Sequence, residues 1–238
     1  EAIVREDLRK LAIDVYQQTH DCDWGTAARA IPGLNDLLML GKAYFHATEQ
    51  QSDGEYVWDK VIVDAPATGH GVFLLQIPSV ITSTLSSGHM YEEAQKILDF
   101  LRDPERTVLN LVTLAEEMPF NETLMLKDQA REQIGVPVGN VVINGLYPAL
   151  FDDETGEWLE GLRERYAGDD AGLTGMLEAA AFRRQRIEMQ RTYVERLHEE
   201  MAGPFFEIPH YFADRLTFPN IASIAEAFET QAEEHAHE

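Results

Sequence analysis

The amino-acid sequence predicts an α/β fold with a doubly wound, mostly parallel sheet. Four short apolar runs rich in β-branched residues indicate the strands, and long helical patterns separate them. Because these runs are continuously apolar rather than alternating, they are typical of strands covered by helices on both faces. The chain has 238 residues, of which 45% are hydrophobic, so it can fill the core of one large domain.

The elements follow in chain order. Residues 1 to about 20 space their apolar side chains as a helix does, and a second apolar helix begins near Leu34. The segment 152–176 is acidic and contains glycine, so we expect a surface excursion of the single domain, with one short helix between loops. We expect strands at Val57–Val63, Thr107–Leu114, Asn140–Leu146 and Phe205–Ile208, and helices at Met90–Arg102, Glu122–Gln133, Leu177–Met201 and Ile221–Glu234.

The charge of the chain excludes some partners. It carries 42 acidic and 19 basic residues, for a net charge of −23. Such a surface repels nucleic-acid backbones and acidic phospholipids, so neither is an expected partner. We interpret the acidity as a solubility device or an adaptation to salt, with an acidic interaction surface as the less favoured alternative.

Cysteine usage and hydropathy limit the class further. Cys22 is the one cysteine, so the sequence has no internal disulfide and no zinc site built from two CxxC pairs. No apolar run approaches the roughly 20 residues of a membrane span. The amphipathic start carries no signal-peptide pattern. We therefore expect a cytoplasmic protein.

The stretch "VIVDAPATGH" places an aspartate at the end of an apolar run. In open α/β sheets ligands bind at the carboxyl ends of the strands, where Asp64 would orient a water on Mg²⁺. Gly69 has no side chain, so its backbone N–H can approach a terminal phosphate. An aspartate followed by a glycine turn is also a common structural device, and this interpretation stays open.

The same stretch resembles the switch II segment of the ArsA/GET family of deviant P-loop ATPases, whose usual form is close to D-T-A-P-T-G-H. Asp64, Gly69 and His70 keep that spacing. Further motifs follow in the family's order from about Pro32 to the C-terminus. They are "IPGLNDLLMLGKAYF", "LVTLAEEMPFNET" with a helix opening at Glu122 and Thr123, "NVVINGLYP", "RIEMQRTYVERL" and "FFEIPHYFADRL".

The resemblance implies an Mg²⁺-dependent ATPase whose hydrolysis drives a conformational cycle. Asp64 and Gly69 would be catalytic, with Asp64 holding Mg²⁺ through water. Asn144 would hold the adenine edge, and the family's dimerisation implies a homodimer or a paralogous heterodimer. Thr68, His70, Asn144, Pro209 and Tyr211 are the residues expected to bind nucleotide.

The sequence departs from the family at its phosphate-binding loop. No G-x-x-x-x-G-K-[ST] occurs in the 238 residues, and the switch I segment is also absent. The phosphate-binding lysine and the Mg²⁺-binding hydroxyl belong to that loop. We therefore expect the C-terminal two-thirds of a longer polypeptide, with a sheet incomplete at its N-terminus and no ATP hydrolysis by this part alone.

Two metal sites of the family are not expected. The zinc-binding cysteines that join some members into dimers would fall near Ala180 and Arg183, and neither residue type binds zinc. A metalloid site needs several thiolates, which Cys22 alone cannot supply. The cofactors expected are thus ATP and Mg²⁺, without zinc.

Two clusters have alternative interpretations. Phe73, Leu74, Leu75, Ile77, Val80 and Ile81 follow switch II and would line a groove for a client protein, although core packing is the favoured interpretation. The arginines at 183, 184 and 186 would reach a phosphate, but we favour solvated i,i+4 pairing with glutamates on the same helix. The function hypotheses are accordingly an ATPase subunit and a non-catalytic paralogous subunit that binds a partner or client.

Overall fold

The computed structural model describes residues 34–166 and 170–236, so the helix predicted at the N-terminus lies outside the described residues. The chain forms two compact units. Unit 1 contains the described residues up to Val108 together with Asp128–Pro137, and unit 2 contains Leu109–Lys127 and the described residues from Val138 onward.

Unit 1 is built from helices. They are α3 (Leu34–Thr48), α4 (Thr68–Thr84), α5 (His89–Arg102) and the short π-helix η1 (Ala130–Ile134). Their apolar faces form a core that includes Leu40 of α3, Leu74 of α4 and Leu98 of α5, all buried. The guanidinium of Arg102 donates a hydrogen bond from Nε to the Ile134 carbonyl at 2.8 Å, which ties α5 to the end of η1. The helix expected from Leu34 is confirmed.

The strand predicted at Val57–Val63 is wrong. Within the described chain, an isolated bridge between Gln50 and Tyr56 is the one β-pairing near it, and residues 58–67 have no regular secondary structure. Ile62 is 92% exposed. A strand exists through hydrogen bonds to a neighbouring strand, and no described strand pairs with this run. High β-propensity without a partner backbone therefore leaves an extended, solvated segment.

Unit 2 contains a three-stranded parallel sheet with the order β1-β2-β3. The strands are β1 (Leu109–Leu114), β2 (Val138–Leu146) and β3 (Phe205–Pro209), which confirms the other three predicted strands. Helix α6 (Glu117–Gln129) follows β1, and α7 (Asp153–Tyr166) and α8 (Ala171–Glu200) connect β2 to β3. Parallel neighbours require such crossovers, so the expected α/β class is confirmed.

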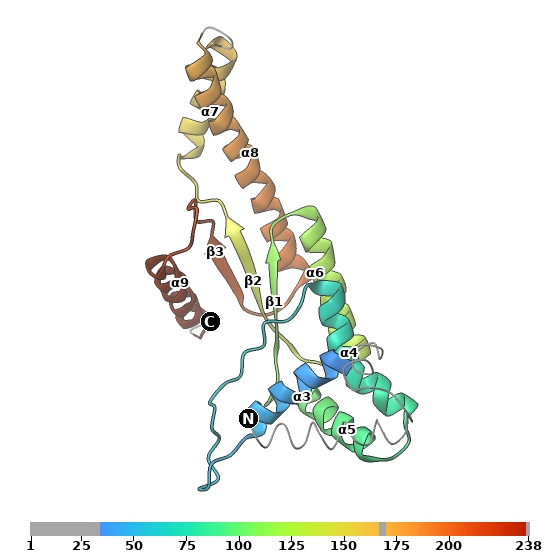
Figure 1. The fold of residues 1–238 in the computed structure, drawn as a ribbon. Coiled ribbons are helices and arrows are strands. Elements are labelled where there is room, and N and C mark those ends of the chain that lie inside the picture. The colour runs from blue at the N-terminus through green and yellow to red at the C-terminus, as the bar shows by residue number, and fades with distance from the viewer. Residues whose placement is uncertain (1–33, 167–169, 237–238) are drawn as a thin grey trace. The chain divides into compact units, whose positions relative to one another are not determined.

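Helices cover both faces of β3. Phe205 belongs to the core cluster with Leu197 of α8. The next side chain, Phe206, stacks against Phe228 of α9 (Phe218–Ala236) with 5.1 Å between ring centroids. Because successive strand residues point to opposite faces, α8 and α9 lie on opposite sides of the sheet (Figure 1). The full core cluster on the α8 side is Leu111, Ala115, Phe120, Val141, Ile143, Leu197, Met201 and Phe205.

The predicted helices are confirmed with shifted ends. Helix α5 begins one residue early at His89, and α9 extends to Ala236. Helix α6 begins at Glu117, so Glu122 and Thr123 lie in its second turn rather than at its start. The hydroxyl of Thr123 donates to the Thr113 hydroxyl of β1 at 2.8 Å, and this buried contact anchors α6 on the sheet.

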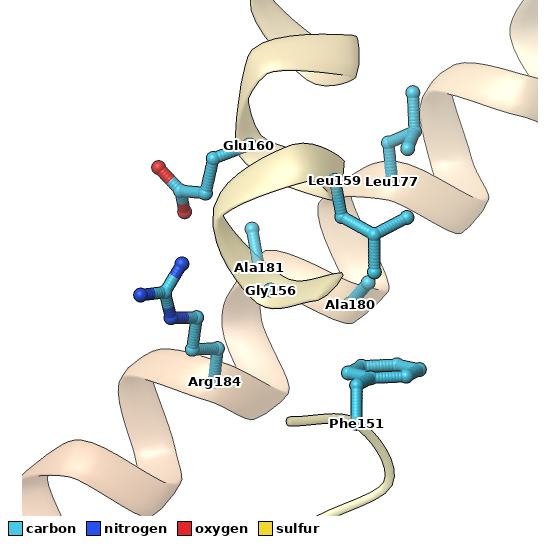
Figure 2. A pocket seen from close by; sticks show the side chains of 8 residues that line it. All are labelled: Phe151, Gly156, Leu159, Glu160, Leu177, Ala180, Ala181 and Arg184. Atoms are coloured by element: carbon cyan, nitrogen blue, oxygen red, sulfur yellow. The ribbon is translucent and has the colours of Figure 1, made fainter. Parts of the chain in front are cut away.

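The acidic segment 152–176 is a helical hairpin rather than a short helix between loops. Helix α7 packs against the first half of α8, which already begins at Ala171, and the hairpin projects past the carboxyl ends of the strands (Figure 1). Figure 2 shows its contact layer, where Leu159 and Phe151 face Ala180 and Leu177. Small residues let the helices approach, since a Cβ added at Gly156 would lie 3.3 Å from the Arg184 side chain.

The start of α7 provides a prediction on acid stability. The Asp152 carboxylate accepts a hydrogen bond from the Thr155 backbone N–H at 2.8 Å. Hydrogen bonds from the Thr155 side chain and backbone lower the pKa of Asp152. A carboxyl with a lowered pKa stabilises the folded state at neutral pH, and this stabilisation is lost as pH falls and the group protonates. We expect Asp152→Ala to reduce α7 protection from hydrogen exchange at pH 7, with a difference from the wild type that shrinks as pH falls through the lowered pKa of Asp152; equal protection at pH 7 would contradict this.

Candidate functional site

The segment from Asp64 to His70 joins an extended stretch to the N-terminus of α4. Asp64 is exposed and lies four residues before Thr68, the first residue of α4. It therefore follows an irregular segment rather than the strand that the sequence predicted. Within the described residues, no basic group forms an ion pair with its carboxylate. An exposed carboxylate without such a partner suits a Mg²⁺ ion that keeps most of its waters.

The first turn of α4 is shaped by two glycines with different surroundings. The amides of His70 and Gly71 donate to the Ala67 carbonyl at 2.9 and 3.0 Å. A Cβ at Gly71 would lie 2.8 Å from the Pro66 carbonyl oxygen, so this position requires glycine for close approach. A Cβ at Gly69 would meet no atom within 4 Å. The absence of a side chain at Gly69 is thus not needed for packing in unit 1.

His70 has a partner inside unit 1. Its Nε2 lies 3.3 Å from Oδ1 of Asp36, a residue of α3 that is 8% exposed. The imidazole also stacks on Phe73, with 6.1 Å between ring centroids. His70 therefore connects the start of α4 to α3, and the nucleotide contact expected of it stays a prediction.

The apolar residues that follow on α4 divide into two groups. Leu74 and Ile77 are buried in the core of unit 1. Phe73 is 42% exposed and Val80 is 56% exposed, while Ile81 is half-buried. The helix therefore contributes to the core with one face and presents apolar side chains to solvent with another.

The residues predicted to seat adenine lie in unit 2, at the carboxyl ends of β2 and β3. Asn144 is an exposed residue of β2, opposite Leu114 of β1 in the register. Pro209 ends β3 and lies opposite Leu146, and Tyr211 follows two residues later. Because the strands are parallel, Asn144 and Tyr211 lie at the same edge of the sheet, where ligands bind in open α/β folds.

Gly145 is the second-last residue of β2. Its φ is +71°, a left-handed conformation that glycine adopts readily. The space beside it is filled on two sides, since an added Cβ would meet Leu114 at 3.6 Å and His210 at 3.9 Å. The His210 amide donates to the Leu146 carbonyl at 2.7 Å. This backbone hydrogen bond connects the end of β2 to the segment that follows β3.

Side chains of α8 contact the backbone segments at the carboxyl ends of β2 and β3. Gln190 is 4% exposed and bonds to the backbone of Gly145 and Tyr147. Arg183 donates to the Pro148 carbonyl at 2.8 Å, and Arg186 forms an ion pair with Glu116. The solvated i,i+4 pairing expected for Arg183 and Arg186 is therefore wrong: their partners lie 35 and 70 residues away along the chain.

Sequence reasoning missed the structural roles of these α8 residues. Arg186 and Gln190 stood in a motif noticed for its resemblance, but the motif does not name their partners. Arg183 was considered in the sequence as a position where zinc-binding members of the family have a cysteine. No spacing rule connects it to Pro148, because that contact depends on how the α7–α8 hairpin returns to the sheet.

Among the described residues, no group of three histidine, cysteine or acidic side chains is arranged to hold a metal ion. In the same part of the chain, no helix is both long and apolar enough to cross a membrane.

Comparison with known proteins agrees with the motifs. Residues 86–167 match the family model described as anion-transporting ATPase. ATPase BagA of Mycobacterium tuberculosis (strain ATCC 25618 / H37Rv) is 29% identical over 128 residues, which cover 54% of this chain and 37% of that protein. ATPase GET3 of Eremothecium gossypii is 27% identical over 153 residues, covering 52% and 43% respectively.

The arsenical pump-driving ATPase of Escherichia coli is 30% identical over 106 residues, which cover 39% of this chain and 18% of that protein. The chain thus spans less than half the length of each of these three relatives. Proteins named as ATPases in bacteria and a fungus are therefore similar to this chain, which also has a parallel α/β sheet and the motif order of such proteins. Residues 86–167 thus match the anion-transporting ATPase family, and parts of the chain are similar to ATPases of the ArsA/GET family.

Proposed function

We propose that the intact protein is a Mg²⁺-dependent ATPase in which ATP binding and hydrolysis drive a conformational switch. In this proposal Asp64 holds a Mg²⁺-bound water, and the backbone of Thr68 and Gly69 approaches the terminal phosphate, with His70 beside it. Asn144, Pro209 and Tyr211 seat the adenine. The cofactors are ATP and Mg²⁺, and the protein is cytoplasmic and works as a homodimer or a paralogous heterodimer.

The observation that carries the proposal is the open start of α4. A helix N-terminus presents unpaired backbone N–H groups and favours negative charge. At this one, Ala67 supplies no side-chain cap, and the space around Gly69 is empty. The exposed carboxylate of Asp64 stands a few residues before it in the chain. These are the features that a phosphate and its magnesium ion require.

Magnesium would supply neutralisation of phosphate charge when bound, and the donor chemistry fits it. Mg²⁺ prefers oxygen ligands and keeps several waters, so one carboxylate acting through water is a suitable protein contribution. Asp64 offers such oxygens, free of ion pairs with the described cations. The role of this chain is to place that carboxylate and to leave the approach to Gly69 clear.

The direct test is turnover of ATP by the intact gene product, with and without Mg²⁺. We expect hydrolysis that depends on magnesium and a single class of ATP sites in calorimetry. No heat of binding and no phosphate release at saturating ATP and Mg²⁺ would overturn the proposal.

A second candidate is a non-catalytic paralogous subunit that binds a partner or client protein. The exposed apolar side chains of Phe73 and Val80 favour it, since a solvent-facing apolar stripe on a helix suits an amphipathic partner. In the same experiment this alternative predicts nucleotide binding without turnover. A crosslinkable residue placed at Val80 would then capture a client in the absence of hydrolysis.

A further inference from the structure

We propose that Arg183 and Gln190 of α8 are positioning residues that hold the two adenine-side loops and thereby set the base preference of the site. The first loop is residues 145–148, which begins with the last two residues of β2, and the second is residues 210–212, after β3. This inference rests on the proposed nucleotide function and extends it to residues that do not themselves touch the base.

Gln190 holds the first loop by two hydrogen bonds to its backbone. Its Oε1 accepts from the Tyr147 amide at 2.8 Å, and its Nε2 donates to the Gly145 carbonyl at 3.1 Å. The Gln190 side chain is 4% exposed, so the two bonds satisfy the donor and the acceptor of a buried amide. A primary amide both donates and accepts, which a carboxylate or an aliphatic side chain cannot do.

Arg183 connects the first loop to the second. Its guanidinium carbon lies 4.6 Å from the ring centroid of Phe212 and 5.7 Å from that of Tyr147. The two rings meet edge to face, with 5.1 Å between their centroids. The same guanidinium donates to the Pro148 carbonyl at 2.8 Å. One planar cation thus fastens aromatic residues of both loops, which are 65 residues apart in the chain.

His210 completes the cluster between the two rings. Its centroid lies 4.9 Å from Tyr147 and 4.5 Å from Phe212. Asn144 directly precedes the first loop, and Tyr211 lies between His210 and Phe212 in the second. Fixing the loops therefore fixes both residues proposed to contact adenine. Small displacements of a positioning group weaken recognition strongly, so loosening α8 should affect the base more than the phosphates.

The experiment measures the affinity of the intact protein for ATP, GTP and inorganic triphosphate, together with hydrogen exchange of residues 145–148 and 210–212. The variants are Arg183→Ala, Arg183→Lys and Gln190→Met. Arg191→Ala is the matched control, because Arg191 is an exposed arginine on the same helix whose partner is Glu188. Circular dichroism checks that each variant folds.

We expect Arg183→Ala to weaken ATP binding about tenfold, as the loss of a partly buried cation–π contact implies. Affinity for triphosphate should change less than about twofold, the ATP-over-GTP preference should shrink, and both loops should exchange faster. Arg183→Lys should recover only part of the affinity, since an ammonium lacks the guanidinium plane. Arg191→Ala should behave like the wild type.

Equal losses for ATP and triphosphate in Arg183→Ala would overturn the inference, and so would unchanged ATP affinity with unchanged loop exchange. Should Gln190→Met fail to fold, the two variants of the half-buried Arg183 decide the question alone. If the wild type itself binds no ATP, the proposed function fails and this inference fails with it. If the wild type binds ATP and no variant differs from it, the proposed function stands and only the positioning roles of Arg183 and Gln190 are rejected.

Discussion

Replacing Asp64 with asparagine should reduce ATP turnover by the intact protein about 100-fold, the size of effect seen when one electrostatic contributor to a transition state is removed. Asparagine keeps the shape of the side chain but loses the negative charge that Mg²⁺-bound water requires. Because Asp64 is exposed and free of ion pairs with described residues, the fold should be unaffected. The measurement is steady-state phosphate release across a Mg²⁺ titration.

Asp59→Asn is the matched control for this experiment. Asp59 lies in the same irregular segment and is also exposed, so it reports any general effect of removing an acidic charge from the segment. We expect its turnover to equal that of the wild type. Equal rates for the wild type and Asp64→Asn would remove Asp64 from the mechanism, and a similar loss in both variants would assign the effect to the charge of the whole segment.

Alanine at Gly69 and at Gly71 should separate a functional glycine from a structural one. At Gly69 the new Cβ meets no atom within 4 Å, so we expect unchanged unfolding but a fall in turnover of about tenfold or more, because the methyl group blocks the approach of phosphate. At Gly71 the Cβ would lie 2.8 Å from the Pro66 carbonyl oxygen. That clash should cost about 1–3 kcal/mol of stability.

Thermal unfolding and ATP turnover of the two variants are compared side by side. A Gly69→Ala protein with full activity would show that no ligand approaches the backbone there. A Gly69→Ala protein that unfolds as early as Gly71→Ala would mean that residue 69 is needed for packing, and the structural interpretation of the turn would then hold.

The strands show how far an apolar run predicts structure. The run at 57–63 is richer in β-branched residues than any of the runs that became β1, β2 and β3. The difference is the neighbour: β2 lies between two parallel partners, whereas no described strand pairs with residues 57–63. The β-propensity of a residue describes how well it suits a sheet. A strand forms only when its backbone hydrogen-bonds to a second backbone, and the local sequence does not specify that partner.

The sequence likewise predicted some residues of the candidate site and not others. Asp64 and Gly69 were predicted from their residue types and spacing, and Asn144 from the family resemblance. Arg183 and Gln190 were not found as parts of the site, because their contacts with residues 145–148 cross 35 to 45 residues. Spacing rules for a helix describe neighbours three or four residues apart and do not extend to such contacts.

The sequence by itself determined the fold class, the three paired strands with their intervening helices, and the similarity to a family of ATPases, because these depend on periodicity and on short motifs. The tertiary structure decided which apolar residues of α4 are buried, which glycine of its first turn is required by packing, and which side chains of α8 hold the loops after β2 and β3. These properties depend on what surrounds a residue in space, and long-range packing alone establishes those surroundings.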